Sequence, residues 1–258
     1  MKITKQQFDS LPVVGGIKQC PSGDYSLISS FGERCSFGDR CSFGKECSFG
    51  ERCSFGEECS FGERCSFGEG CSFGERCSFG KECSFGERCS FGEGCSFGKW
   101  CSFGKWCSFG EECSFGEWCS FGERCSFGEE CSFGEGCSFG EGCSFGKRCS
   151  FGERCSFGEE CSFGEWCSFG EGCSFGKECS FEGNHKYVGN SPYWKFGGFG
   201  SRTGSELYVY NFKSGLHVRA GCWFGTIEDF RQRVLDKYSE EHEYIDIINL
   251  CKKKFIKK

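Results

Sequence analysis

Histidine is scarce in this chain, and closely spaced cysteine pairs are absent. Only His185, His217 and His242 occur among 258 residues, and all three lie outside the repeats that fill the middle of the chain. We find no nucleophile–base pair and therefore expect no catalytic residue and no enzyme activity. No CxxC spacing occurs, whereas zinc sites usually contain such close thiolate pairs, so we expect no metal ligand and no cofactor.

Long apolar runs are also missing. No stretch of about 18 apolar residues exists, which predicts that nothing spans a membrane. The opening MKITKQQFDSLPVVGG has neither the apolar core nor the cleavage site of a signal peptide, so we expect a cytoplasmic protein. In a reducing compartment, cysteine is more plausibly a small buried apolar residue than half of a disulfide.

What the chain contains in excess is Gly, Phe and Cys, with 42, 33 and 28 residues. They belong to the unit Cys-Ser-Phe-Gly-x-x, which continues almost unbroken from Phe31 to Phe181. In a strand, alternation directs Cys and Phe to one face and Ser to the other, and Gly-x-x then forms a corner. Three units close a triangular coil of 18 residues, so the pattern predicts an all-β parallel solenoid.

The unit resembles the hexapeptide repeat of left-handed parallel β-helices. Read from Phe31 as FGERCS, it has a large apolar residue, a small residue, two free positions, a second small residue and a free position. The resemblance implies a left-handed helix. Many such proteins are acyltransferases that use a histidine and a loop interrupting the coil, and the repeats here contain neither.

The same register extends beyond the perfect repeats 31–181. Tyr25 lies six residues before Phe31, and Tyr187, Tyr193 and Phe199 follow in step. The prediction is a β-helix of about nine to ten coils over 25–199. His185 at an inward small position sets an earlier alternative end near Phe181.

The two ends differ from the repeats. Residues 1–24 are expected to form an N-terminal cap, and residues 200–258 a small α+β C-terminal cap. Within the latter, ELYVYNFKSGLHVRAG predicts a β-hairpin, and Thr226 begins a first helix with Asp229 three residues on. The periodic spacing of Tyr244, Ile247, Ile248, Cys251 and Phe255 predicts a second helix.

The segment LHVRAGCWFGTIEDFRQRV, with LPVVGGIKQCPSGDY near the N-terminus, resembles uncharacterised proteins encoded by phages and prophages, including cysteine-rich repeat proteins. The resemblance implies a protein that acts in the host cytoplasm. It implies no particular activity.

Charge sets limits on nucleic-acid partners. The corner positions from Glu33 to Glu178 hold 26 acidic and 15 basic residues, a net charge of −11. Direct nucleic-acid binding by the rod is disfavoured. Mimicry of DNA, as an inhibitor of a host defence enzyme, is an alternative function, although a rod of about 45 Å would need roughly 26 negative charges to match B-DNA.

The cysteines form three internal columns, one for each face. Packing of free thiols is the favoured interpretation, and a metal- or redox-linked function of the columns is the second alternative. Rows of outward Ser next to Gly leave ice binding as a minor hypothesis.

Four corner positions hold tryptophan: Trp100, Trp106, Trp118 and Trp166. Trp100 and Trp118 are 18 residues apart and should share one corner of adjacent coils. Because Trp is enriched at interfaces, we interpret these residues as a candidate surface for a protein partner of the host or virion, or for self-association. Drift of the repeat without consequence explains them equally well. The favoured function is a non-enzymatic, rigid interaction protein.

Overall fold

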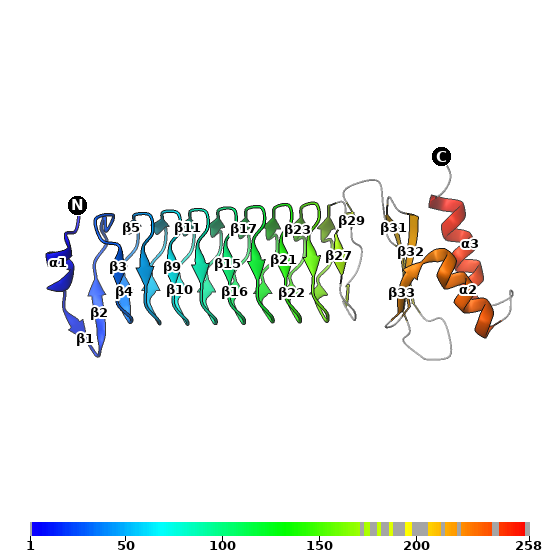
Figure 1. Ribbon diagram of the computed structural model, residues 1–258, viewed down its shortest axis with the longest axis horizontal. Coiled ribbons are helices and arrows are strands. Elements are labelled where there is room, and N and C mark those ends of the chain that lie inside the picture. The colour runs from blue at the N-terminus through cyan, green and yellow to red at the C-terminus, as the bar shows by residue number, and fades with distance from the viewer. Residues whose placement is uncertain are drawn as a thin grey trace.

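A computed structural model places the repeats in a rod of parallel strands, with a short helix at one end and a sheet with two helices at the other (Figure 1). The structure describes residues 2–170, 173–175, 180–181, 186–187, 194–197, 206–212, 215–220, 223–238 and 243–255. The predicted parallel β-solenoid with a small α/β C-terminal region is confirmed.

Each face of the rod is a sheet of nine parallel solenoid strands in the described part of the chain. One face contains β3 (Ser30–Phe31), β6 (Ser48–Phe49), β9 (Ser66–Phe67), β12 (Ser84–Phe85), β15 (Ser102–Phe103), β18 (Ser120–Phe121), β21 (Ser138–Phe139), β24 (Ser156–Phe157) and β27 (Ser174–Phe175). The next contains β4 (Cys35–Phe37), β7 (Ser54–Phe55), β10 (Ser72–Phe73), β13 (Ser90–Phe91), β16 (Ser108–Phe109), β19 (Ser126–Phe127), β22 (Ser144–Phe145), β25 (Ser162–Phe163) and β28 (Ser180–Phe181). The third contains β5 (Ser42–Phe43), β8 (Ser60–Phe61), β11 (Ser78–Phe79), β14 (Ser96–Phe97), β17 (Ser114–Phe115), β20 (Ser132–Phe133), β23 (Ser150–Phe151), β26 (Ser168–Phe169) and β29 (Lys186–Tyr187).

The register between coils is 18 residues, as the repeat predicts. Ser72 pairs with Ser90 and Phe73 with Phe91, and the same step recurs along every face. Because identical residues face each other, every coil offers the next one the same surface. The left-handed winding implied by the hexapeptide resemblance stays a prediction.

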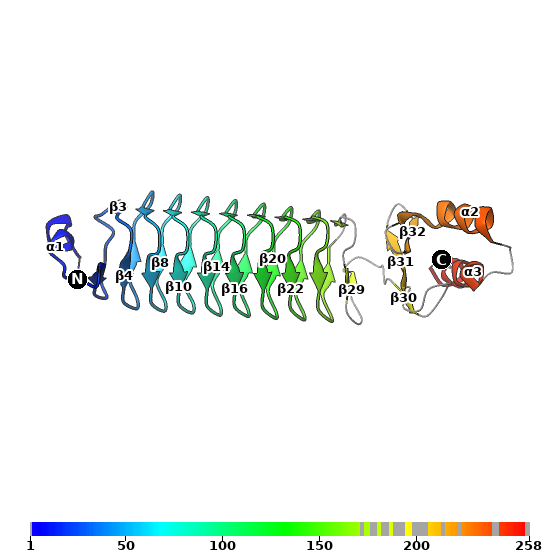
Figure 2. The same cartoon turned by 90° about the horizontal axis from the view of Figure 1, so that it is seen from below.

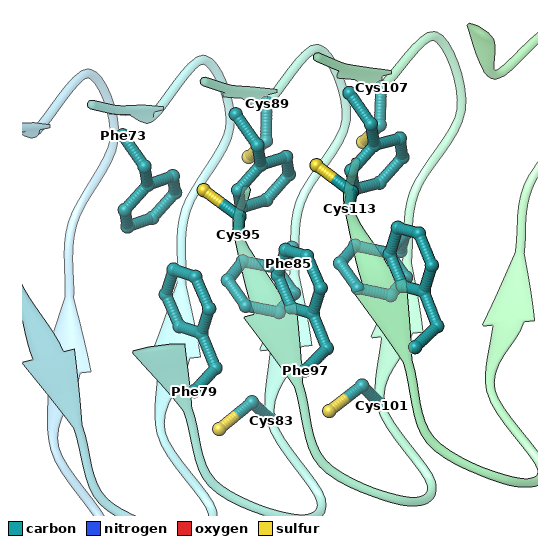
Figure 3. Packing of buried hydrophobic residues seen from close by; sticks show 14 of the residues in the cluster. Phe73, Phe79, Cys83, Phe85, Cys89, Cys95, Phe97, Cys101, Cys107 and Cys113 are labelled. Carbon is teal, nitrogen blue, oxygen red and sulfur yellow. The ribbon is translucent and has the colours of Figure 1, made fainter. Parts of the chain in front are cut away.

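Phenylalanine fills the centre of the rod (Figure 3). Rings of one face stack in parallel, with the Phe73 and Phe91 centroids 4.8 Å apart and 2° between their planes. Rings of different faces meet edge to face, as do Phe73 and Phe79, with centroids 5.0 Å apart and 87° between their planes. Both geometries suit the aromatic quadrupole, and such pairs contribute about 0.5–1.5 kcal/mol beyond area burial. One large ring in every unit is therefore enough to fill the core.

Glycine after phenylalanine is required by the close approach of consecutive coils. A Cβ placed on Gly98 would lie 2.7 Å from the Lys81 nitrogen and 2.8 Å from the Gly80 carbonyl carbon. Contacts of this kind recur at the equivalent glycines along the rod. Any larger residue would push two backbones apart, and the backbone cannot yield as a flexible side chain would.

Cysteine donates a hydrogen bond to this same corner. The Sγ of Cys95 donates to the carbonyl oxygen of Gly74 in the preceding coil at 3.4 Å, and the contact repeats at 3.3–3.5 Å from Cys53 to Cys173. No backbone N–H donates to these carbonyls among residues 32–152 of the structure. The thiol therefore satisfies an inward carbonyl that would otherwise be left without a donor, at a site where the cysteines are almost fully buried.

The N-terminal cap contains a helix that the sequence analysis missed. Helix α1 (Lys5–Asp9) begins at Thr4, whose hydroxyl accepts from the Gln7 backbone N–H while the Gln7 side chain accepts from the Thr4 backbone N–H. The signal was present as Thr-x-x-Gln, a capping box. The helix buries Phe8, whose ring packs edge to face on Phe31 and closes the first coil.

Strands β1 (Val13–Val14) and β2 (Ile17–Cys20) form a hairpin, and β2 pairs in parallel with β4. This part of the cap therefore continues a solenoid sheet. Tyr25 holds the aromatic position expected for it: it is fully buried and stacks on Phe43 at 5.5 Å.

The C-terminal region is an antiparallel sheet in the order β30 (Trp194–Gly197), β31 (Glu206–Phe212), β32 (Gly215–Ala220) and β33 (Trp223–Thr226). Helices α2 (Ile227–Lys237) and α3 (Glu243–Phe255) follow. The predicted hairpin and both predicted helices are present, and Thr226 caps α2 by accepting from the Asp229 backbone N–H. Among the described residues, no helix combines the length and apolar character needed to cross a bilayer.

Strand β31 faces in two directions. Leu207 and Val209 pack with the helices, whereas the alternate residues Tyr208 and Tyr210 belong to the hydrophobic cluster of the rod. Figures 1 and 2 accordingly show the sheet between the rod and the two helices. The sheet covers the end of the aromatic core, which is the role expected of a cap.

The last described solenoid strand is β29, in which Tyr187 pairs with Phe169. Strand β30 pairs antiparallel with β31, so residues 194–197 belong to the C-terminal sheet. The aromatic positions Tyr193 and Phe199, and His185, lie outside the described residues.

The thiol–carbonyl contact predicts a difference between two conservative substitutions. Cys95→Ala should lower the free energy of unfolding by about 1–3 kcal/mol, because it leaves the Gly74 carbonyl buried without a donor. Cys95→Ser retains a donor and should cost less than Cys95→Ala. Chemical denaturation followed by circular dichroism measures both, and equal stability of the two variants would contradict a hydrogen-bonding role.

The close approach of coils predicts a second contrast, between two glycines four residues apart. Gly98→Ala should destabilise the rod strongly or prevent folding, because its Cβ would overlap backbone atoms. Gly94→Ala should cost only about 1 kcal/mol, the strain of a positive φ, because its Cβ meets only the Arg76 side chain at 3.4 Å. Thermal denaturation of the two variants would contradict this account if their midpoints agreed.

Candidate interaction surface

In the repeats, the turn residue just before each cysteine from Cys35 to Cys167 adopts a left-handed backbone conformation. Trp100, Trp106, Trp118 and Trp166 have φ of 59°, 56°, 60° and 64°, and arginine or glutamate has the same conformation in other coils. Glycine occupies this position at residues 70, 94, 136 and 142. The N–H of this residue donates to the next coil, as from Trp100 to the Glu117 carbonyl at 3.0 Å. The corner backbone is thereby fixed, and its side chains project outward.

The turns form three corners along the rod. The first corner starts with Glu33-Arg34, the second with Asp39-Arg40 and the third with Lys45-Glu46, and each repeats every 18 residues. Over the described turns, the first corner holds eight acidic and five basic residues, a net charge of −3. The second corner holds ten acidic and four basic residues, a net charge of −6. The third corner holds six acidic and five basic residues, a net charge of −1. The acidity of the rod is therefore uneven, and the third corner is almost neutral.

Trp100 and Trp118 lie on the third corner in adjacent coils, as predicted. Their exposed fractions are 54% and 46%. The Trp118 ring lies over the next turn, because a Cβ on Gly136 would come within 2.5 Å of its Cε3 atom. The Lys99 ammonium and the Glu117 carboxylate beside them form an ion pair at 2.8 Å. The corner thus presents two indoles next to charges that already neutralise each other.

The other tryptophans are separate from this pair. Trp106 lies on the first corner, where the Arg88 guanidinium lies 5.4 Å from its ring centroid. Trp166 lies on the second, most acidic corner and is 52% exposed. The structure therefore brings together only Trp100 and Trp118 of the four candidate residues.

The thiol columns are inaccessible from outside. The cysteines from Cys35 to Cys167 are at most 2% exposed. The neighbouring Cys113 thiol and burial raise the pKa of Cys95 to about 12, and burial raises the pKa of Cys251 to about 12. Neutral thiols are hydrogen-bond donors and poor metal ligands. Within the described ranges, no group of three His, Cys, Asp or Glu residues could hold a metal ion.

Among the histidines, the structure describes only His217, which lies on β32 opposite Tyr210 and Thr226. His185 and His242 lie outside the described residues.

Two features of the corners were not predicted from the sequence. The left-handed conformation was signalled only by the glycine that precedes cysteine in several repeats. The neutral third corner is visible in the sequence only when the turn charges are grouped by their 18-residue step.

Comparison with protein families finds similarity to one family model, described as an RNA-binding, Nab2-type zinc finger. The matched segments cover less than half of the chain: residues 30–44, 58–74, 64–80, 76–92, 82–98, 100–116, 106–122, 142–158, 149–164 and 155–170. Comparison with curated proteins and with solved structures finds no match.

The rod places the cysteines of the matched segments differently from zinc ligands. A zinc site gathers four Cys or His ligands around one ion. Here the cysteines of a segment belong to different faces, and no histidine occurs between Phe31 and Phe181. The acidic corners also give the rod the wrong sign for an RNA backbone.

The pKa values of Cys95, Cys113 and Cys131, each raised to about 12, predict loss of stability at high pH. A thiol with a pKa of about 12 in the fold and near 9 when unfolded favours the folded state fully below pH 9. That contribution is lost as the pH rises from 9 to 12. We expect the denaturation midpoint to fall over this range, and ultraviolet thiolate absorbance to appear together with unfolding. Thiolate absorbance below pH 9 in an intact rod would contradict neutral columns.

Proposed function

We propose that this chain is a non-enzymatic, rigid interaction protein that binds a protein partner through its tryptophan-bearing corners. The observation that carries the proposal is the exposure of two indoles in adjacent coils of one corner. Corner side chains project away from the core, and glycine, arginine and glutamate adopt the same backbone conformation there in other coils. The fold therefore gains little from tryptophan at these positions, whereas an interface gains a large apolar contact.

The rod also supports this function by its stiffness. Backbone hydrogen bonds connect each coil to the next at the strands and at the corner, for example from Ser102 to the Cys83 carbonyl and from Glu82 to the Lys99 carbonyl, both at 2.9 Å. Side chains on such a rod keep fixed spacings, so binding a partner costs little entropy for ordering the rod. The thiol columns would persist in a reducing cytoplasm, where we place the protein.

The resemblance to phage and prophage proteins supports a host or virion protein as the partner. Mimicry of DNA receives less support from the charges. The second corner has a net charge of −6 along eight coils, about 38 Å, whereas B-DNA carries roughly 22 charges over that length.

Substitution of the tryptophans tests the proposal. Trp100→Glu with Trp118→Glu should leave the unfolding free energy within about 0.5 kcal/mol, because both side chains are exposed corner residues. A partner identified by affinity purification from host cells, and then purified, should bind this variant at least about tenfold more weakly than the parent chain. Trp166→Glu is the matched control.

The proposal would be contradicted if none of the substitutions at the four tryptophans changed the binding of the partner. A chemical activity of the purified chain that persists in these variants would also contradict it.

A further inference from the structure

We infer that the third corner is the interface of a symmetric antiparallel dimer, in which the partner of Trp100 and Trp118 is a second copy of this chain. The inference rests on the proposed function in taking the exposed tryptophans as contact residues. It makes a second copy of the chain a partner of these residues and gives its orientation, so a host or virion protein that uses the same two indoles competes with the dimer.

The distribution of charge among the corners favours contact through the third corner. Two copies of an acidic rod repel each other, and the repulsion is smallest where the net charge is smallest. The third corner has a net charge of −1 over its seven described turns, against −3 and −6 over the eight described turns of each of the other two. It is also the corner on which two exposed indoles lie in adjacent coils. Like-charge repulsion and apolar burial thus select the same corner.

The order of charges along this corner favours an antiparallel pair. The first position of each turn is mostly lysine before the tryptophans, at Lys45, Lys81 and Lys99, with Glu63 as the exception. After them it is always glutamate in the described turns, at residues 117, 135 and 153. Neither of the other corners has such a division in its described turns, because each has a single lysine there in its row of acids.

A twofold axis between the coils of Trp100 and Trp118 brings these halves together. Because an antiparallel pair places equal numbers of coils on either side of the axis, Lys99 faces Glu117 of the second copy, and Lys81 faces Glu135. Each contact occurs twice by symmetry. One coil further out, Glu63-Arg64 faces Glu153-Arg154, where the charges of each turn cancel.

Contacts between the tryptophans favour the antiparallel orientation over the parallel one. In the antiparallel pair, equivalent turn positions lie on the same side of the contact, so Trp100 faces Trp118 of the second copy and four indoles form one cluster. In a parallel pair related by an axis along the rods, Trp100 faces Lys99 and Trp118 faces Glu117. Burial of the indoles against each other removes more apolar surface from water.

The axis also lies near the middle of the rod. Four turns of the third corner, from Lys45-Glu46 to Lys99-Trp100, precede it, and the described turns from Glu117-Trp118 to Glu153-Arg154 follow it. An antiparallel pair therefore overlaps along most of the corner. The contact gains from the full row of charges and from the tryptophans at its centre.

Sedimentation of the full chain over a range of concentrations tests the dimer. The parent chain and the control Trp166→Glu should be dimers, and the double variant Trp100→Glu, Trp118→Glu should be a folded monomer by circular dichroism. A monomeric parent chain would overturn the inference. Partner binding that persists in such a monomer would leave the proposed function intact, so the two failures are distinguishable.

Charge reversal at positions 81 and 135 tests the register. The two residues are three coils apart within a chain, so they can couple only between copies. Lys81→Glu alone and Glu135→Lys alone should each weaken the dimer by roughly 3- to 30-fold, because two exposed ion pairs are reversed. A mixture of the two single variants should form heterodimers as stable as the parent dimer. Heterodimers no more stable than the single-variant homodimers would contradict this register.

A spin label on Lys45→Cys tests the orientation, since the native thiols that the structure describes are buried and protected from labelling. The antiparallel pair separates the two residue-45 backbones by seven coil steps, about 34 Å. A parallel pair would place the labels side by side, and a short label–label distance would overturn the antiparallel assignment.

Discussion

The glycine corner is the constraint on which the rod depends. Consecutive backbones approach so closely there that a Cβ on Gly98 would overlap Lys81 and Gly80, and the inward carbonyl that this geometry creates is satisfied by a cysteine thiol. Phe, Gly and Cys are therefore coupled: the ring fills the core, glycine permits the approach, and the thiol satisfies the corner. Serine and the two corner residues of each unit are not part of this coupling. Because each coil contacts only coils like itself, the same packing contacts recur along the whole rod. This explains the strict repetition of the unit.

Much of the fold could be predicted because it follows from local periodicity. Alternation placed Cys and Phe inside, the 18-residue coil followed from three units, and the strand and helix patterns of the C-terminal region were correct. Helix α1 was missed although Thr4 and Gln7 form a capping box, because its five residues carry too little periodicity. The sequence alone did not predict the thiol–carbonyl hydrogen bond, since it depends on the distance between coils. The C-terminal limit of the solenoid was also not determined by the sequence, because it depends on pairing between strands. Lys186–Tyr187 continues the parallel pairing, whereas the next described strand, Trp194–Gly197, belongs to another sheet.

The position of the candidate surface was predictable from the sequence, but its side-chain packing and ion pairing were not. The 18-residue spacing placed Trp100 and Trp118 on one corner, and their exposure agrees with an outward position. The packing of Trp118 over Gly136 and the ion pair of Lys99 with Glu117 depend on side-chain conformations that the repeat does not specify. An identical backbone with variable corner residues separates two tasks: the invariant residues build the rod, and the corner residues determine what it contacts.

The central claim is that the cysteines are neutral, buried hydrogen-bond donors. Titration with a thiol reagent, combined with elemental analysis of the same sample, tests it most directly. The account predicts few reactive thiols in the native protein, nearly all 28 after denaturation, and no stoichiometric metal. Zinc or iron in stoichiometric amount, or rapid reaction of most thiols in the folded protein, would contradict it.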